Sequence, residues 1–144
     1  MKTGIYDVVV DSYAWVEYFL GSESGEVIKN YLKNASAIYT PSIVLAELAR
    51  KYLREGVDIN EIRRRLLFIS EISIIVDIDL ELSLEAAISY RVLTEHVKRR
   101  GIKSKPSLVD AVILAVSRLK NAKILTGDTH FKELRYTIWI GASK

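Results

Sequence analysis

Short runs rich in valine and isoleucine alternate with helical runs along the chain, and this alternation constrains the fold more than any other feature. The strand-like runs cover residues 5–10, 37–40, 72–76, 123–126 and 136–140. Between them apolar residues recur at helical spacing, and the last two helices are expected over about residues 80–100 and 107–119. Strands that alternate with helices predict an α/β fold, with about five mainly parallel strands covered by helices on both faces.

The length of 144 residues fits a single domain over residues 1–144. No apolar run approaches the ~18 residues of a membrane span, and the first residues lack the pattern of a signal peptide. We therefore expect a cytoplasmic protein without a membrane anchor. Cysteine is absent and only two histidines occur, which excludes disulfides, thiolate metal sites and histidine-rich sites. Chemistry must depend mainly on carboxylates, hydroxyls, lysine and arginine.

One acidic residue lies in the most apolar segment of the sequence. Residues 108–116 read LVDAVILAV, and every one of them except Asp110 is apolar. A helix that is apolar on all sides is a buried helix, and aspartate is rarely buried unless it is paired or bound to a metal. Asp110 is therefore a candidate functional carboxylate.

Three further carboxylates are expected at one edge of the sheet. Asp11 follows the first strand and Asp128 follows the fourth, so both lie at the carboxyl edge if these strands are parallel. Asp110 lies in the first turn of the helix that leads into the fourth strand, and Glu47 lies inside the helix after the second strand. Ligands of such sheets bind at the carboxyl edge. These four acids form the candidate site.

Each of the four acids also has a local explanation. Asp11 fits the N-cap of its helix, and Glu47 can pair with Lys51 one turn on. Asp110 fits a capping box with the serine three residues before it, and Asp128 in Thr-Gly-Asp fits a turn. The functional interpretation differs because it requires all four to meet at one edge.

Carboxylates that meet in a partly dry site repel one another, and a divalent cation removes this cost. Oxygen ligands without cysteine or histidine favour Mg²⁺ or Mn²⁺ over zinc. Mg²⁺ sites are commonly completed by phosphate oxygens, which indicates chemistry on a phosphodiester. Ser12, Ser107 and Thr126 stand beside three of the acids, and we expect them to orient the carboxylates through hydrogen bonds.

Four segments carry these residues in order: VVVDSYAWVEYF, TPSIVLAELARKY, SLVDAVILAVSR and ILTGDTHFKEL. They resemble the motifs of the PIN-domain family, in particular of VapC-type toxins from prokaryotic toxin–antitoxin pairs. The resemblance implies a Rossmann-like PIN fold and a metal-dependent endoribonuclease, with Asp11, Glu47, Asp110 and Asp128 as metal-binding catalytic acids and Thr126 in support. It also implies an RNA substrate, a cognate antitoxin protein and a homodimer.

A basic cluster precedes the helix of Asp110, and here the chain looks longer and more basic than that family leads us to expect. Five basic residues fall within eight positions: Lys98, Arg99, Arg100, Lys103 and Lys105. The cluster is a candidate for binding RNA phosphates. The alternative is a solvated helix end, where cations complement the helix dipole.

Two other classes of protein remain as alternatives. One is a catalytically degenerate PIN-like module that only binds RNA or protein. The other is a receiver-like signalling domain, because Lys105-Pro106 resembles the Lys-Pro signature of receivers. A receiver needs paired acids after its first strand, whereas Ser12 follows Asp11 here.

Three residue groups receive structural expectations. An apolar stripe near the N-terminus is the candidate surface for a homodimer or an antitoxin segment, with ordinary core as the alternative: Val27, Ile28, Tyr31 and Leu32. We expect His96 to be an exposed helix residue, and His130 to be a structural side chain in a loop.

Overall fold

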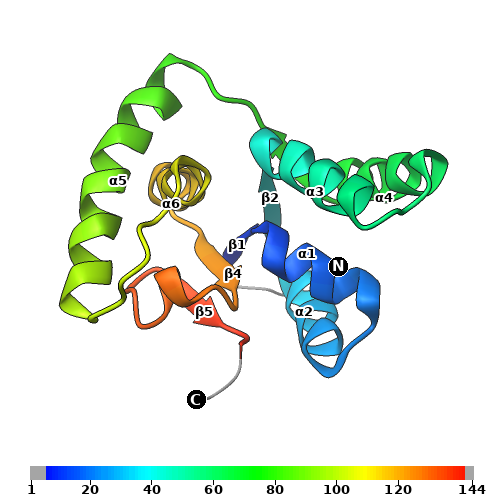
Figure 1. Ribbon diagram of the computed structural model, residues 1–144, viewed down its shortest axis with the longest axis horizontal. Coiled ribbons are helices and arrows are strands. Elements are labelled where there is room, and N and C mark those ends of the chain that lie inside the picture. The colour runs from blue at the N-terminus through cyan, green and yellow to red at the C-terminus, as the bar shows by residue number, and fades with distance from the viewer. Residues whose placement is uncertain (1–5, 142–144) are drawn as a thin grey trace.

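The computed structural model describes residues 6–141 (Figure 1). The elements of this part are β1 (Asp7–Val10), α1 (Ser12–Leu20), α2 (Glu23–Asn34), β2 (Ala37–Pro41), α3 (Ser42–Arg54), α4 (Ile59–Ile72), β3 (Ile74–Val76), α5 (Leu80–Arg99), α6 (Leu108–Lys120), β4 (Lys123–Thr126), the 3₁₀ helix η1 (Thr129–Phe131) and β5 (Thr137–Trp139). The expected first strand began at residue 5, which lies outside the described residues, as do the two ends of the expected domain.

The five strands form one parallel sheet in the order β3-β2-β1-β4-β5. The central strand β1 is buried on both faces, since Val8, Val9 and Val10 are fully inaccessible. This confirms the α/β prediction. Receiver-type folds have the order 2-1-3-4-5, and Lys105-Pro106 precedes α6 rather than ending a strand. Both observations contradict the receiver-like alternative.

Helices cover the sheet on both sides (Figure 1). On one side α6 packs against β1, β2 and β4, and α5 covers α6. On the other side lie α1 to α4, with α1 in contact with α2 and α3, and α3 in contact with α4. The sheet is therefore the middle of three layers, and its carboxyl edge is where helices from both sides begin.

Helix α6 is the most deeply buried helix of the described chain, as its sequence predicted. Every residue from Asp110 to Ser117 is buried. Asn121 ends the helix in the left-handed conformation, with φ of 52°, a conformation that asparagine tolerates better than most residues. The chain then enters β4 directly, so α6 and the end of β4 are fixed relative to each other.

The apolar stripe on α2 is largely core. Ile28 and Leu32 are buried, Tyr31 is half-buried, and only Val27 is exposed. The prediction of a dimer or antitoxin surface on this stripe was therefore wrong, because Ile28 and Leu32 belong to the hydrophobic core. Within residues 6–141, no helix is both long enough and apolar enough to cross a membrane.

Candidate metal centre

Asp11 and Asp128 meet because β1 and β4 are parallel neighbours, with Val10 opposite Leu125. The carboxyl ends of the two strands therefore lie side by side. The hydroxyl of Thr126, the last residue of β4, donates a hydrogen bond to Asp11 Oδ2 and accepts one from the Asp128 backbone N–H at 2.9 Å. The predicted supporting role of Thr126 thus has a geometric basis, since one hydroxyl joins both acidic strand ends.

Asp11 is also the N-cap of α1. Its Oδ1 accepts a hydrogen bond from the Ala14 N–H at 2.9 Å, and the residue is 2% exposed. Ser12 begins α1 beside it, but among the described residues no hydrogen bond joins the Ser12 hydroxyl to a carboxylate. The local explanation of Asp11 as a cap is therefore correct, and the cap itself faces the acidic site.

Asp110 combines a cap with a place in the acidic cluster. The expected capping box is complete, because Ser107 N–H donates to Asp110 Oδ2 at 2.9 Å and Asp110 N–H donates to Ser107 Oγ at 3.1 Å. The same Oδ2 lies 3.1 Å from His130 Nδ1. The two explanations offered by the sequence are not exclusive: Ser107 fixes the carboxylate that faces the cluster.

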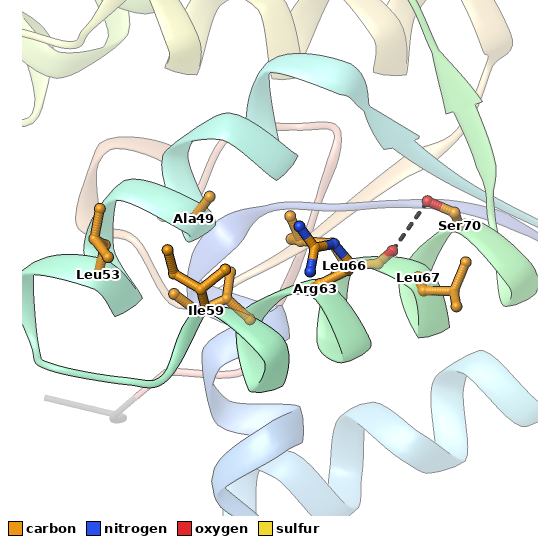
Figure 2. A pocket seen from close by; sticks show the side chains of 8 residues that line it. Ala49, Leu53, Ile59, Arg63, Leu66, Leu67 and Ser70 are labelled. Carbon is orange, nitrogen blue, oxygen red and sulfur yellow. Dashed lines mark hydrogen bonds between the residues drawn. The ribbon is translucent and has the colours of Figure 1, made fainter.

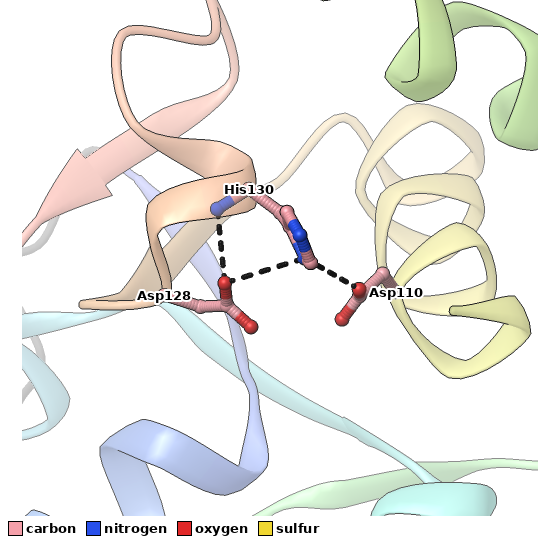
Figure 3. A group of neighbouring side chains, drawn as sticks. All are labelled: Asp110, Asp128 and His130. Carbon is pink, nitrogen blue, oxygen red and sulfur yellow. Dashed lines mark hydrogen bonds and ion pairs between the residues drawn. The ribbon is translucent and has the colours of Figure 1, made fainter. Parts of the chain in front are cut away.

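His130 lies between Asp110 and Asp128 (Figure 3). Its Nδ1 is 3.1 Å from Asp110 Oδ2 and 3.6 Å from Asp128 Oδ1, and its backbone N–H donates to Asp128 Oδ1 at 2.9 Å. One ligand atom from each of the three residues lies within 4.8 Å of the others. This position of His130 was not predicted from the sequence. Its spacing could have indicated it, because a residue two positions after Asp128 shares the same tight turn and can lie beside the same carboxylates.

The three aspartates act on one another electrostatically. Burial raises the pKa of Asp11 to about 7, and the charges of Asp128 and Asp110 add to the rise, against the hydrogen bonds from Thr126 and Ala14 that lower it. Burial also raises the pKa of Asp128, and the Asp110 carboxylate adds to it, whereas the hydrogen bond and charge of His130 act in the opposite direction. The site therefore holds more negative charge than its surroundings stabilise.

Glu47 lies beside this cluster rather than in it. The residue is half-buried and lines a groove of about 170 Å³ with Ile43, Arg50 and Val109, the residue next to Asp110. The local pairing expected with Lys51 does not form, because Lys51 binds Glu55 at 2.7 Å. Glu47 thus shares a groove with the start of α6, but it is not among the three residues whose ligand atoms lie within 4.8 Å of one another.

The donor set fits a divalent cation. Carboxylate oxygens from three segments converge, and their mutual repulsion is relieved when a cation lies between them. Carboxylate oxygens suit Mg²⁺ and Mn²⁺. A cation there would supply activation of water and charge stabilisation on a phosphoryl group. Asp110 and Asp128 are the residues that would hold it, with Asp11 behind them and His130 beside them.

One residue of the basic cluster, Arg100, contacts another segment of the chain, whereas the other four are exposed. Arg100 Nη1 donates to the Lys132 carbonyl at 2.7 Å, and its guanidinium lies 3.7 Å from Glu133. The other members are exposed: Lys98, Arg99, Lys103 and Lys105. Arg100 is therefore a positioning residue for the segment after η1, and the exposed members are free to meet a phosphate backbone.

His96 shares this structural role, which corrects the expectation of an exposed residue. It is buried, and its Nε2 lies 2.8 Å from the Lys132 carbonyl that Arg100 also contacts. Together His96 on α5 and Arg100 at the C-cap of this helix hold the chain just after η1. The turn that carries Asp128 and His130 is thereby fixed to α5.

An aromatic ring lies at the edge of the cluster. Tyr13 is partly exposed, and burial together with the charges of Glu17, Asp11 and Asp128 raises its pKa. A Cβ atom at Gly127 would lie 2.3 Å from the Tyr13 ring. Gly127 therefore allows the ring to rest on the loop between β4 and Asp128.

A larger apolar groove lies away from the acids, between α3 and α4 (Figure 2). It measures about 440 Å³. Its lining residues are Ala49, Leu53, Ile59, Ile62, Arg63, Leu66, Leu67 and Ser70. Leu53, Ile59 and Leu67 are each more than half exposed. Exposed apolar side chains from two helices are therefore gathered in one groove.

Comparisons with known proteins agree with this geometry. No curated protein sequence matches significantly. Among solved structures, a toxin–antitoxin complex from Klebsiella pneumoniae is similar with a TM-score of 0.66 at 16% identity, covering 92% of this chain and 97% of that one. VapBC2 from Rickettsia felis, bound to a DNA fragment from its promoter, has a TM-score of 0.64 at 19% identity, covering 92% and 96%.

The sarcin-ricin-loop-cleaving toxin VapC20 of Mycobacterium tuberculosis is also similar, with a TM-score of 0.64 at 18% identity, covering 90% of this chain and 95% of that one. At these identities the likeness establishes the fold. The family follows from the sequence itself, because the model of the PIN domain matches residues 8–135. The chain therefore belongs to the PIN-domain family.

Proposed function

We propose that this protein is a metal-dependent endoribonuclease, the toxin of a VapBC-type toxin–antitoxin pair. The observation that carries the proposal is the convergence of Asp11, Asp110 and Asp128 at one sheet edge, where burial and mutual repulsion raise the pKa of Asp11 to about 7. Structural relatives that are toxins, one described as cleaving the sarcin-ricin loop, support the nuclease assignment.

In this proposal Asp11, Glu47, Asp110 and Asp128 are the catalytic acids and bind Mg²⁺ or Mn²⁺. Thr126 and Ser107 hold Asp11 and Asp110 in place. Glu47 extends the acidic edge from α3, on the side where Val109 precedes Asp110. Bound metal would lower the cost of keeping these groups ionised and make water nucleophilic toward a phosphodiester.

The exposed basic residues support RNA as the substrate. Lys103 and Lys105 belong to the loop that enters α6, and Ser104 between them contacts His130 at 2.8 Å. A phosphate backbone that meets this loop is therefore close to the acids. The remaining alternative is a degenerate module that binds RNA without cleaving it, and the convergence of Asp11, Asp110 and Asp128 disfavours it.

Cleavage of RNA by the purified protein tests this function. We expect cleavage with Mn²⁺ or Mg²⁺, none in EDTA, and a loss of several orders of magnitude in Asp128→Asn. The control is Asp79→Asn, since Asp79 caps α5 with a hydrogen bond to Leu82 N–H at 2.8 Å and takes no part in the cluster. RNA binding without cleavage by the wild type would favour the degenerate module.

We further propose that the groove between α3 and α4 binds a segment of a cognate antitoxin. The structural relatives include toxin–antitoxin complexes, and the groove combines apolar walls with cations. Arg63 lines it, and Arg50 and Arg54 are exposed on α3, the helix that contributes Ala49 and Leu53 to its wall. The fitting occupant is an amphipathic segment with apolar side chains toward Leu67 and acidic side chains toward these arginines.

Leu67→Asp tests this surface, because Leu67 is 59% exposed and the substitution leaves the core intact. Coexpressed with the product of the neighbouring gene, the wild type should copurify with it and Leu67→Asp should not, while RNA cleavage by the isolated variant stays unchanged. The matched control is Leu84→Asp, an exposed leucine on α5. Loss of a homodimer in light scattering, with copurification retained, would assign the groove to a second copy of the chain instead.

A further inference from the structure

We propose that His130 is itself a metal ligand, through Nδ1, and that Ser104 holds it in the coordinating tautomer. The added nitrogen would make the centre prefer Mn²⁺ to Mg²⁺. This inference rests on the proposed metal centre and adds to it a ligand that the acids do not provide. It concerns the identity of the metal, so it can fail while the nuclease proposal stands.

The geometry singles out Nδ1. This atom faces carboxylate oxygens from two different elements, 3.1 Å from Asp110 on α6 and 3.6 Å from Asp128 after β4 (Figure 3). The backbone N–H of His130 is bonded to Asp128 Oδ1 and the next residue, Phe131, is fully buried, so the main chain that carries the ring is fixed. The ring itself is oriented by its contacts with Asp110 and Ser104. A cation bound by both carboxylates would therefore lie beside Nδ1.

The other ring nitrogen has a partner of its own. Nε2 lies 2.8 Å from Ser104 Oγ. If Nε2 carries the proton it donates to Ser104, and the lone pair of Nδ1 then faces the carboxylates. That arrangement is repulsive unless a cation lies between them. Histidines that bind metals usually donate their second N–H to a fixed acceptor in this way, and Ser104 is suited to be that acceptor.

The ligand set decides the metal preference. Mg²⁺ binds almost only oxygen and keeps several waters, whereas imidazole nitrogen suits first-row transition ions. A set of carboxylates joined by one imidazole therefore favours Mn²⁺ more than the same carboxylates alone would. Ser104 belongs to the basic loop proposed to meet RNA, so the residue that orients His130 also lies next to the substrate path.

The competing explanation is that His130 carries a proton on Nδ1, donates it in a hydrogen bond to Asp110 and turns away when metal arrives. The two explanations differ at the metal itself. Only a ligand places a nitrogen nucleus in direct contact with Mn²⁺, and this contact is visible in pulsed electron paramagnetic resonance. The chain has two histidines, so a signal from imidazole has only two possible sources in tag-free protein.

The experiment adds Mn²⁺ alone to tag-free protein and records nitrogen modulation of its spin echo. We expect modulation in the wild type and in His96→Gln, whose imidazole contacts the Lys132 carbonyl instead, and none in His130→Gln. Ser104→Ala should keep the modulation but weaken Mn²⁺ binding about tenfold. Circular dichroism checks that each variant is folded.

Calorimetry with Mn²⁺ and Mg²⁺ gives the second readout. His130→Gln should lower the ratio of Mn²⁺ to Mg²⁺ affinity, because it removes nitrogen and leaves oxygen donors. Mn²⁺ bound without nitrogen modulation in the wild type would overturn the role of His130 and leave the nuclease proposal intact. An unchanged affinity ratio in His130→Gln would overturn the metal preference. Absence of Mn²⁺ binding to the wild type would overturn both proposals.

Discussion

Replacing Asp11 by asparagine should stabilise the metal-free protein at neutral and alkaline pH. Asp11 is almost completely buried, and its pKa rises from 3.8 to about 7 because of that burial and of the neighbouring Asp128 and Asp110. Asparagine removes the charge but can keep the cap, since its side-chain oxygen accepts from Ala14 N–H as the carboxylate does. Its amide group would donate to the Thr126 hydroxyl.

The magnitude follows from proton linkage. Because the pKa is raised in the folded state, folding favours the protonated acid, and its contribution is fully present below the unfolded pKa of 3.8. It is lost as the pH rises through about 7. A difference of roughly three pKa units corresponds to about 4 kcal/mol, which is an upper limit for the free energy of unfolding that the wild type loses across this range.

Urea denaturation in EDTA at about pH 4.5 and about pH 8 measures the effect. The stability of the wild type should fall more steeply with pH than that of Asp11→Asn, and saturating Mn²⁺ should reverse the loss at the higher pH. Asp79→Asn is the matched control, because Asp79 accepts the same kind of cap bond from Leu82 but is exposed. If wild type and Asp11→Asn lose stability in parallel as the pH rises, the electrostatic account of the site is refuted.

Two further outcomes are expected. Replacing Lys103 and Lys105 together by alanine should flatten the plot of log binding constant for RNA against log salt concentration, by up to ~0.7 in slope for each lost single-strand phosphate contact. The control Lys33→Ala on α2 should leave this slope unchanged, and equal slopes in both variants would exclude the loop from RNA binding. Ser107→Ala should lower the free energy of unfolding by about 1 kcal/mol with or without Mn²⁺, whereas Asp110→Asn should abolish the stabilisation by Mn²⁺. Thermal denaturation measures both effects, and a full response to Mn²⁺ in Asp110→Asn would make Asp110 only a cap.

The sequence predicted the part of the site that follows from topology. Once the strands are parallel, acids directly after β1 and β4 must lie at the same edge, and so must the first turn of a helix that returns to β4. Asp11, Asp110 and Asp128 could be placed in this way. The predicted bounds of the helices and strands were close to the observed ones for a local reason, since valine-rich runs mark strands and capping residues mark helix starts.

The parts that were missed depend on side-chain direction. The η1 turn aims His130 back at Asp110, and no periodic pattern describes a turn of three residues. His96 could have been found, because it continues the buried spacing of Ser89 and Leu93 on α5. Glu47 illustrates another limit: the sequence placed it on the helix after β2, but could not show that it would line a groove with Val109 rather than join the group of Asp110, Asp128 and His130.

The nature of the ends that cleavage leaves tests the central claim most directly. A metal-activated water attacks phosphorus without help from the ribose, so the products should carry 5′-phosphate and 3′-hydroxyl ends. An RNA with a single 2′-deoxy residue at the scissile position should then be cut in Mn²⁺ as the all-ribose RNA is, and EDTA should stop both reactions. Cyclic 2′,3′-phosphate ends, or cleavage that persists in EDTA, would contradict a metal centre built from Asp11, Asp110 and Asp128.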